Sequence, residues 1–404
     1  MKILVSATLG GGSAGTWYAI ETAKRFQARG HQVWYLSRRG HSALERALSA
    51  GLPTIDHIDL EEKSPFKFYG NLRRLIDLLR RHSPDVILAH GGEDHAAWGL
   101  AKAMRAPEVA LIRVRALDPK PPKRHPMSIW LHSRATDMIV TANSRHFAAY
   151  QGRLRIPPNK LRIIEAGIDS SDYSDLSDSA MRENGVELPK GKPLVVMVAR
   201  FAPIKGHRVL VSAAGILKRR GIPCHFLLIG YPKDYTAEQF QRWSVEGNLL
   251  DDFTVIDRLL PRLPALLSRC DIGAIASLGS ETVSRSLLEY LASGLPAIAT
   301  DVGGISDIMS RGEFGRLIRP DNANALADAI ADLLSDNNRR LRMANAARNY
   351  VHSHCTWEQR VDQWEEVMYE TVARVRGESI PTLNSGEPPP DPNAPPCDSD
   401  DSVP

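Results

Sequence analysis

Residues 279–304, GSETVSRSLLEYLASGLPAIATDVGG, form the stretch of sequence that decides the fold. Its apolar positions have the spacing of one helix face: Leu287, Leu288 and Leu291. Gly294 fits the position just past the end of a helix, and Pro296 cannot continue one. The apolar run that follows is typical of a buried strand. The stretch therefore predicts a polar loop, a helix that begins near Thr282, and a strand.

Two carboxylates bracket the start of this predicted helix. Glu281 and Glu289 are eight positions apart, which corresponds to roughly 12 Å along a helix axis. Two carboxyl groups that flank one glycosidic bond in a retaining enzyme are only about 5 Å apart, so these two are expected to hold different parts of one long ligand. The helix N-terminus between them, near Thr282 and Val283, favours an anion such as a diphosphate. A sugar nucleotide fits this order; alternatively, both glutamates are solvated charges.

Apolar runs alternate with helical segments along most of the 404 residues. Six runs, from KILVSA at residue 2 to LRIIEAG at residue 161, precede a polar stretch at 168–191, and six more follow it, from PLVVMVAR to GRLIRP. This rhythm predicts an α/β protein with two Rossmann-like, doubly wound parallel sheets. Ligands of such sheets bind at the carboxyl ends of the strands, so we expect the site between the two domains.

The predicted organisation has five parts. They are a first domain at 1–167, a linker at 168–191, a second domain at 192–355, a helix at 356–376 and an acidic, Pro-rich tail at 377–404. The tail lacks aromatic residues and is expected to be disordered.

The charge balance also separates the tail from the body. The formal net charge is +4, and the tail carries six acidic and no basic side chains, which leaves the body at +10. A basic body suits an anionic substrate and an anionic membrane surface. No aromatic-basic signature of a nucleic-acid module is present, so a nucleic-acid partner is not expected. The four cysteines lack metal-ligand spacing, and no signal peptide or membrane-spanning stretch is recognised, which favours a cytoplasmic protein without metal sites.

A second charged motif, VARFAPIKGH at 198–207, follows the first strand of the second domain. Arg200 offers a rigid fork for two phosphate oxygens, and Lys205 supplies a compact charge. Their order, upstream of the two glutamates, resembles the R-x4-K-G and E-x7-E motifs of retaining GT-B glycosyltransferases of family 4. The resemblance implies that Glu281 contacts the donor sugar and that Glu289 contacts the ribose. It also implies that the final helix crosses back onto the first, acceptor-binding domain and that no metal ion or other cofactor is required.

The glycines after the first strand allow two interpretations. Gly10, Gly11, Gly12 and Gly15 satisfy G-x-G-x-x-G between a strand and a helix, and Arg38 and Arg39 follow the next strand. Together they fit an NADP-dependent Rossmann oxidoreductase. That alternative leaves Arg200, Lys205, Glu281 and Glu289 without a role. Because similar GT-B enzymes have a glycine-rich first loop close to the donor phosphates, the resemblance assigns Gly11 and Gly12 to donor binding.

Two further strand ends in the first domain carry polar residues. His90 ends the strand DVILAH, where the resemblance implies a contact with the donor sugar or the acceptor, although a structural histidine is common at such positions. In the next strand many relatives have a histidine, but this chain has Arg113 and Arg115. These arginines indicate either an anionic acceptor or a basic rim.

Residues 66–82, FKFYGNLRRLIDLLRRH, predict an amphipathic helix. Its leucines are expected to face the core, whereas its arginines could rest on anionic lipid or simply on solvent. The predicted site of action is therefore the cytoplasm or the inner face of the cytoplasmic membrane.

The resemblance implies transfer of a sugar from a nucleoside-diphosphate sugar to a hydroxyl of a glycan or lipid-linked acceptor, with retention at the anomeric carbon. The basic first domain suggests a role in cell-envelope polysaccharide or lipopolysaccharide synthesis. Besides the oxidoreductase, a sugar-nucleotide epimerase of related fold and a non-catalytic scaffold are the alternatives.

Overall fold

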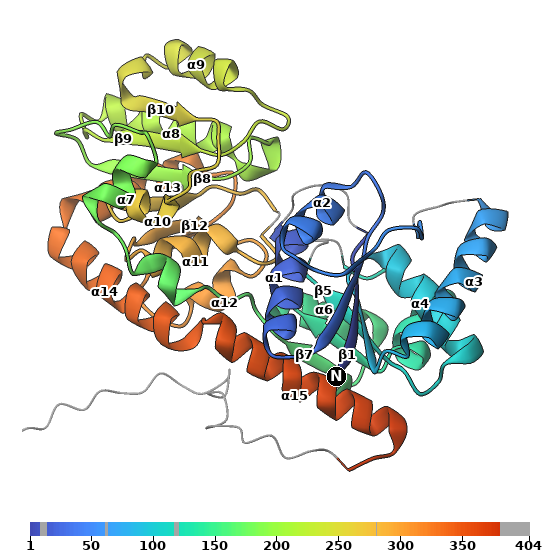
Figure 1. The fold of residues 1–404 in the computed structure, drawn as a ribbon. Helices are drawn as coiled ribbons and strands as arrows, with labels where there is room; N and C mark the ends of the chain where they lie inside the picture. The colour runs from blue at the N-terminus through green and yellow to red at the C-terminus, as the bar shows by residue number, and fades with distance from the viewer. Residues whose placement is uncertain (9–13, 61–63, 117–120, 280, 380–404) are drawn as a thin grey trace, which may run out of the picture.

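The computed structural model describes residues 1–8, 14–60, 64–116, 121–279 and 281–379. The chain folds into two units, each built on a parallel sheet that helices cover, so the predicted α/β class is confirmed (Figure 1). Two predictions fall on residues outside the described ranges: the roles of Gly11 and Gly12, and disorder in most of the acidic tail.

The first sheet has the strand order β3-β2-β1-β4-β5-β6-β7, and all its paired strands are parallel. Its strands are β1 (Lys2–Ser6), β2 (Gln32–Leu36), β3 (Thr54–Ile55), β4 (Val86–Ala89), β5 (Ala110–Arg115), β6 (Met138–Thr141) and β7 (Leu161–Ile163). The order reverses between β1 and β4, and a crevice for ligands lies at the carboxyl ends of strands that flank such a reversal.

The second sheet repeats the pattern with the order β10-β9-β8-β11-β12-β13, again parallel. Its strands are β8 (Leu194–Val198), β9 (His225–Ile229), β10 (Phe253–Ile256), β11 (Ile272–Ile275), β12 (Ala297–Thr300) and β13 (Gly315–Ile318). Here the order reverses between β8 and β11. The two charged motifs of the sequence follow these two strands.

Helices cover both sheets and connect them. In the first unit they are α1 (Ala14–Ala28), α2 (Ser42–Ser49), α3 (Pro65–His82), α4 (Gly92–Arg105), α5 (Pro126–Trp130) and α6 (Ser144–Leu154). The connection, at the predicted linker, contains a short 3-10 turn (Ser170–Tyr173) and α7 (Asp178–Glu183). The second unit contains α8 (His207–Arg219), α9 (Ala237–Glu246), α10 (Leu263–Leu267), α11 (Arg285–Ala292), α12 (Ile305–Met309), α13 (Ala323–Ser335) and α14 (Asn337–His354).

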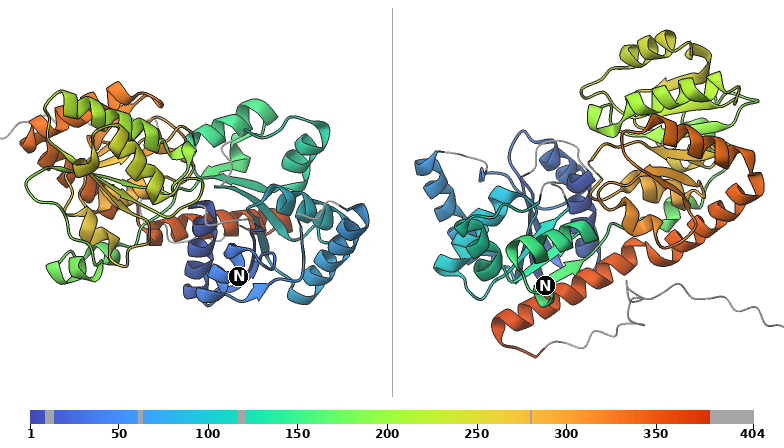
Figure 2. Two further views of the ribbon diagram at one scale, coloured as in Figure 1. Left: turned by 90° about the horizontal axis from the view of Figure 1, so that it is seen from above. Right: turned by 180° about the vertical axis from the view of Figure 1, so that it is seen from behind.

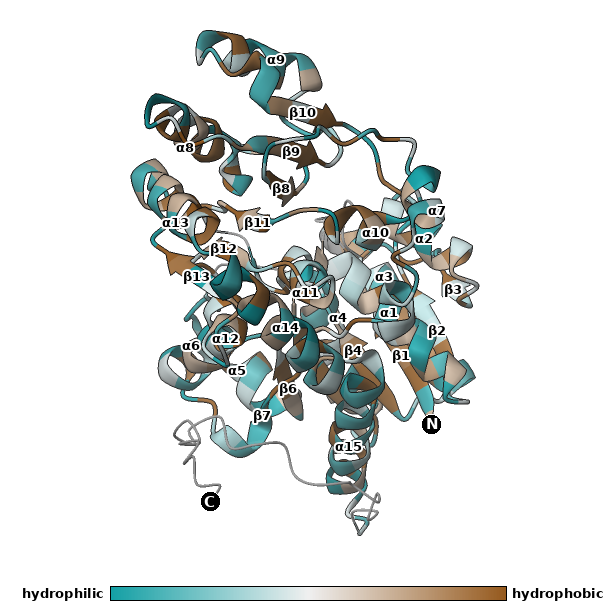
Figure 3. Cartoon of the chain, turned by 90° about the vertical axis from the view of Figure 1, so that its left-hand side faces the viewer, coloured by the Kyte–Doolittle hydropathy of each residue, from teal (hydrophilic) through white to brown (hydrophobic). Residues whose placement is uncertain are grey.

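The strands are rich in Val, Ile and Leu because both faces of a helix-covered parallel sheet are buried. In β4, β5, β6, β9, β11 and β12 every residue is buried. Figure 3 shows the resulting pattern, with hydrophobic strands inside and mixed helices around them. The largest apolar cluster contains residues of both units and of the last helix, so the two units share part of one core.

The last helix, α15 (Trp357–Arg376), runs back along the first unit (Figure 2). Thr356 and Gln359 form a capping box at its start, and Gly377 ends it with φ 68°. The indole nitrogen of Trp364 donates to the Tyr18 hydroxyl on α1 at 3.1 Å. Arg376 forms an ion pair with Asp85 just before β4. The crossover helix of the predicted GT-B fold is therefore present.

The predicted start of the helix after Glu281 is wrong by three residues. Helix α11 begins at Arg285, because Ser284 adopts the left-handed conformation with φ 48° and interrupts the helical path. Glu281, Thr282 and Val283 thus belong to a loop. The distance expected from helical rise does not apply to Glu281 and Glu289.

Candidate functional site

An ion pair between Lys205 and Glu281 joins the two charged motifs of the second unit. The side chains are largely buried, with 16% and 9% of their areas exposed, and Ser277 donates a further hydrogen bond to the same carboxylate oxygen. Lys205 follows β8 and Glu281 follows β11, so the reversal of strand order brings them together. Removal of either side chain would leave the other as an unpaired buried charge, which destabilises the fold.

Gly206 explains why a glycine follows Lys205. Its φ is 73°, and a Cβ built there would lie 1.9 Å from the carbonyl oxygen of Ala276. The backbone after Lys205 therefore passes directly against the end of β11. This contact sets the position of the lysine relative to the loop that carries Glu281.

Arg200 lies at the carboxyl end of β8 and is half-buried. Its Nε is buried, and no described residue accepts a hydrogen bond from it. A buried guanidinium nitrogen without a protein partner is suited to an anionic ligand.

The loop before α11 packs against Gly303 and Gly304, and two of its backbone amides have no hydrogen-bond acceptor among the described residues. The carbonyl oxygen of Glu281 accepts a hydrogen bond from the Gly304 amide at 2.9 Å. A Cβ on Gly303, whose φ is 60°, would lie 2.1 Å from the same oxygen. Among the described residues, none accepts a hydrogen bond from the backbone amides of Thr282 or Val283. These amides precede a helix N-terminus, where anions bind favourably.

Glu289 lies one turn into α11 and is paired with Arg285, whose Nε donates to Glu289 Oε1 at 2.8 Å. The Arg285 guanidinium also lies over the ring of Trp17 in α1, 4.7 Å from its centroid. Glu289 is mostly buried, as is the nearby Tyr173, whose pKa is raised by burial and by the Glu289 charge. The ribose contact expected of Glu289 stays a prediction.

His90 is buried at the carboxyl end of β4, with 2% of its area exposed. Burial, and then the positive charge of Arg113, lower its pKa to about 3, so the ring is neutral. Its Nδ1 has no hydrogen-bond partner among the described residues. The donor contact that the resemblance implies stays a prediction.

Arg113 is a buried residue and not part of a basic rim. Its guanidinium donates to the carbonyl oxygens of Ala89 and Gly91, which closes the end of β4. Burial lowers its pKa from the usual value. Arg115 is also largely buried, at the end of β5.

The structure adds residues that the sequence did not single out, at the start of α6. Asn143 donates from Nδ2 to the carbonyl oxygen of Thr282 at 3.1 Å, which links the first unit to the loop after Glu281. Asp307 of α12 accepts from the Ser144 amide and hydroxyl, at 2.6 and 2.5 Å. Arg145 forms an ion pair with Asp301. The sequence signal was present but weak: Asn143 is a typical N-cap residue, two positions after the end of a strand.

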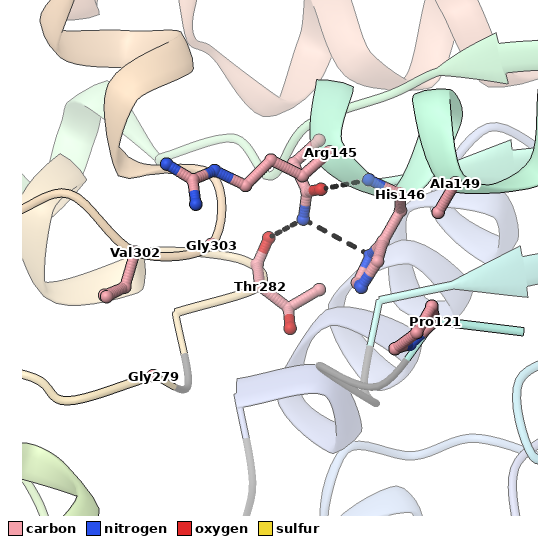
Figure 4. Close-up of a pocket in the computed structure, with 9 residues that line it drawn as sticks. Pro121, Arg145, His146, Ala149, Gly279, Thr282, Val302 and Gly303 are labelled. Carbon is pink, nitrogen blue, oxygen red and sulfur yellow. Dashed lines mark hydrogen bonds between the residues drawn. The ribbon is translucent and has the colours of Figure 1, made fainter. Parts of the chain in front are cut away.

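A pocket of about 260 Å³ lies between α6 and two loops of the second unit (Figure 4). Pro121, Asn143, Arg145, His146 and Ala149 line it from the first unit, and Gly279, Thr282, Val302 and Gly303 line it from the second. The pocket is therefore formed only where the two units meet.

Other sequence-based expectations concern metals, NADP and membranes. Among the described residues, no group of three His, Cys, Asp or Glu side chains is placed to hold a metal ion. Arg38 and Arg39, cited for NADP, are paired with Asp59 and Asp56. None of the helices in the described ranges has the length and apolar character needed to cross a bilayer.

Comparison with known proteins places both units in one group. The model of Glycosyltransferase Family 4 matches residues 15–172, and that of Glycosyl transferases group 1 matches residues 181–350. The chain is 30% identical over 203 residues to the D-inositol 3-phosphate glycosyltransferase of Corynebacterium glutamicum, which covers 48% of each chain. It is 23% identical over 397 residues to the N-acetyl-alpha-D-glucosaminyl L-malate synthase of Bacillus anthracis, which covers 92% of this chain and 98% of that one.

Among solved structures, Anabaena HepE in complex with UDP has a TM-score of 0.77 and 18% identity, and covers 92% of this chain and 100% of that one. Two Rossmann-like units with a pocket where they meet, together with this structural match, define a protein of the GT-B fold. The chain belongs to family 4 of the GT-B glycosyltransferases. The matches to four curated inositol phosphate glycosyltransferases span only 42% to 53% of those proteins' own length.

Proposed function

We propose that this protein is a retaining glycosyltransferase that transfers a sugar from a nucleoside-diphosphate sugar to a hydroxyl group of its acceptor. The observation that carries the proposal is the ion pair between Lys205 and Glu281 at the strand-order reversal of the second sheet. Arg200, whose buried Nε has no partner among the described residues, lies at the end of the strand that precedes Lys205. The UDP in the complex of Anabaena HepE supports a nucleotide donor for this chain as well.

The site supplies what departure of a diphosphate needs. Negative charge develops on the leaving phosphate, and fixed positive groups that face it lower the barrier. Arg200, Lys205 and the amides of Thr282 and Val283 are held in place by the sheet ends and by Gly206, so little reorganisation is needed. These groups act without a metal ion in this proposal. Glu281 orients the sugar. Glu289 binds the ribose through the same carboxylate that Arg285 contacts.

No covalent nucleophile is proposed. The acceptor hydroxyl attacks the same face from which the diphosphate leaves, the C–O bond to the phosphate breaks, and the new glycosidic bond forms on that face. The proton of the hydroxyl passes to a phosphate oxygen of the leaving group. The anomeric configuration is thereby retained.

The acceptor carries the hydroxyl and binds at the first unit. The names of two relatives contain D-inositol 3-phosphate and L-malate, which are small molecules rather than polymers. A glycan or lipid-linked acceptor in the synthesis of cell-envelope polysaccharide or lipopolysaccharide remains our proposal for this chain, because its body is strongly basic.

A panel of nucleotide sugars tests the donor. A ligand present at about 100 times its dissociation constant adds roughly 2.7 kcal/mol to the free energy of unfolding, and thermal denaturation detects this change. We expect stabilisation by one family of nucleoside-diphosphate sugars and by the matching nucleoside diphosphate. NADPH, measured in the same plates, is the control. Stabilisation by NADPH and by no nucleotide sugar would contradict the proposal.

We also propose that α3 rests on an anionic membrane surface. Phe66 is 91% exposed and Tyr69 is also exposed, with Arg73 and Arg74 beside them. Exposed aromatic and basic side chains on one helix are typical of interfacial binding. Sedimentation with phosphatidylglycerol vesicles should remove the native protein from the supernatant. The double variant Phe66→Ser with Arg73→Gln should leave more protein in the supernatant. Equal binding to phosphatidylcholine vesicles would refute a role for these charges.

A further inference from the structure

Four exposed arginines lie along one side of α3. They are Arg73, Arg74, Arg80 and Arg81, and together they are called the basic face of α3 below. Arg73 and Arg80 are seven positions apart, as are Arg74 and Arg81, and seven positions are close to two helical turns. The four residues are therefore aligned on the same side of the helix, over about 12 Å of its length.

The protein itself compensates little of this charge. Arg80 is 3.7 Å from Asp77 in an exposed pair. Among the described residues, no carboxylate forms an ion pair with Arg73, Arg74 or Arg81. Positive charge in the last turn of a helix is favoured by the helix dipole, which accounts for Arg80 and Arg81. The dipole does not account for Arg73 and Arg74, which lie in the middle of α3.

The last helix of the protein ends beside the C-terminal end of α3. Arg376, in the final turn of α15, donates to Oδ1 of Asp85 at 2.6 Å. Asp85 is two positions after Ser83, the C-cap residue of α3. Gly377 then ends α15. The part of the chain that follows α15 therefore starts next to the end of α3.

That part of the chain contains an acidic segment at residues 387–401. The segment has no basic residue and five carboxylates: Glu387, Asp391, Asp398, Asp400 and Asp401. Asp398 is 21 positions after Gly377, and a chain of this length spans at most about 75 Å. Helix α3, by comparison, is about 27 Å long. The acidic segment is therefore long enough to reach all of the basic face.

The basic side chains nearest to the start of this part of the chain already have acidic partners. Arg374 is paired with Glu370, and Arg376 is paired with Asp85. The basic face of α3 is the adjacent positive surface whose charges are largely without such partners among the described residues.

We propose that the acidic segment, residues 387–401, binds along the basic face of α3 in the same chain. Single exposed ion pairs are weak and are screened by salt. The covalent connection, however, raises the effective concentration of the segment to roughly the millimolar range. The contact is therefore intramolecular and depends on ionic strength. It goes beyond the proposed glycosyl transfer and does not depend on it.

A native cysteine allows this contact to be mapped in the full chain. Cys397 directly precedes Asp398. The other thiols are poor targets for a maleimide, since Cys224 and Cys355 are buried and burial raises the pKa of Cys270. Benzophenone maleimide is attached to Cys397, the protein is irradiated in low salt, and the cross-linked peptides are identified by mass spectrometry. We expect cross-links to residues 65–82, within one chain.

Variants of the full chain test the charges on each side of the contact. The neutral-segment variant replaces the five carboxylates with amides: Glu387→Gln, Asp391→Asn, Asp398→Asn, Asp400→Asn and Asp401→Asn. The neutral-face variant has glutamine at all four positions of the basic face. Each variant should lower the yield of cross-links to α3 by at least about fivefold, as should about 1 M salt, where the Debye length is about 3 Å. The matched control has lysine at the same four positions, keeps their charge, and should give a yield within about twofold of the native one.

Three results of this experiment would overturn the inference. The first is a set of cross-links that lies outside α3, and the second is a set that joins two chains. The third is an unchanged yield in the neutral-segment variant, because the benzophenone group and not the carboxylates would then be responsible for the contact.

Vesicle binding separates this contact from the membrane contact proposed for α3. Because the carboxylates of the segment and anionic lipid headgroups would compete for the same arginines, the neutral-segment variant should bind phosphatidylglycerol vesicles more strongly than the native protein. Measurable but equal binding of the two proteins would overturn the inference. Absence of vesicle binding in both would instead refute the membrane contact, and the cross-links would still decide whether the segment binds α3.

Discussion

The two halves of the site are built differently. In the second unit, Lys205, Glu281 and Arg200 come from loops directly after β8 and β11, and each is described by a short local motif. In the first unit, His90 and Arg113 are buried within the strand ends, and the pocket is lined by α6. The difference teaches that a cluster of fixed charges can be built from short local motifs, whereas the pocket beside α6 depends on contacts between distant segments.

The largest effect is expected from the charged half. Glu281→Gln and Lys205→Met should each lower kcat by about 10²–10³-fold, because each removes a group that faces the sugar or the leaving phosphate. Steady-state release of nucleoside diphosphate measures this loss. Lys218 lies at the opposite end of α8 from the motif and pairs with Asp252. Lys218→Met is the matched control and should keep full activity. If Glu281→Gln and Lys205→Met both kept the kcat of the Lys218→Met control, the account would be contradicted.

Gly206→Ala should cost the second unit more than a similar change elsewhere. Gly206 and Gly221 have nearly the same φ, 73° and 70°, but only Gly206 faces a backbone oxygen. The left-handed conformation costs about 1–2 kcal/mol in both variants, and the clash with Ala276 adds roughly 1–3 kcal/mol in the first. Urea unfolding compares the two free energies. Equal losses would show that the close approach to β11 does not constrain Lys205.

The buried histidine of the first half predicts a dependence of stability on pH. The pKa of His90 is about 3 in the folded protein and about 6.5 when unfolded. Below pH 6.5 the unfolded chain therefore binds more protons than the folded protein. As the pH is lowered, this residue reduces the free energy of unfolding by about 1.4 kcal/mol per pH unit. His90→Gln should remove that part of the slope. The free energy of unfolding is measured between pH 7 and pH 5 for both proteins. If it changed with pH equally in both, the result would argue against a neutral buried ring.

The smallest effect concerns the contact between the halves. Arg285 over Trp17 is worth about 0.5–1 kcal/mol as a cation–π pair. A double-mutant cycle with Arg285→Met and Trp17→Leu should give a coupling energy of this size in thermal unfolding. A coupling of zero would mean that the two units do not hold this contact in solution.

Much of the fold could be predicted from the sequence, because helix-covered parallel strands need continuous apolar runs. Twelve of the thirteen described strands coincide with runs such as DVILAH and PLVVMVAR. Strand β3, with two residues at a sheet edge, is too short to produce a pattern. The start of α11 was missed because no local propensity of Ser284 encodes its left-handed conformation. The chain just before it packs through Glu281 against Gly303 and Gly304, which are distant in sequence.

The site was predictable in part. Lys205 and Glu281 were assigned to one ligand because the order of their motifs resembles that of the family, but the ion pair between them was not predicted. The pocket at His146 was not predicted, since its lining includes Asn143 and Thr282, which are 139 positions apart in the sequence. Arg113 was expected at a rim or an acceptor, yet its carbonyl partners place it within the sheet end.

The central claim is that the diphosphate of the donor lies between Arg200, Lys205 and the amides of Thr282 and Val283. A crystal structure of the protein with UDP tests it directly. The account predicts phosphate oxygens within hydrogen-bonding distance of Arg200 and of at least one of the two amides. A diphosphate bound after β1 in the first unit, far from the turn before α11, would contradict it.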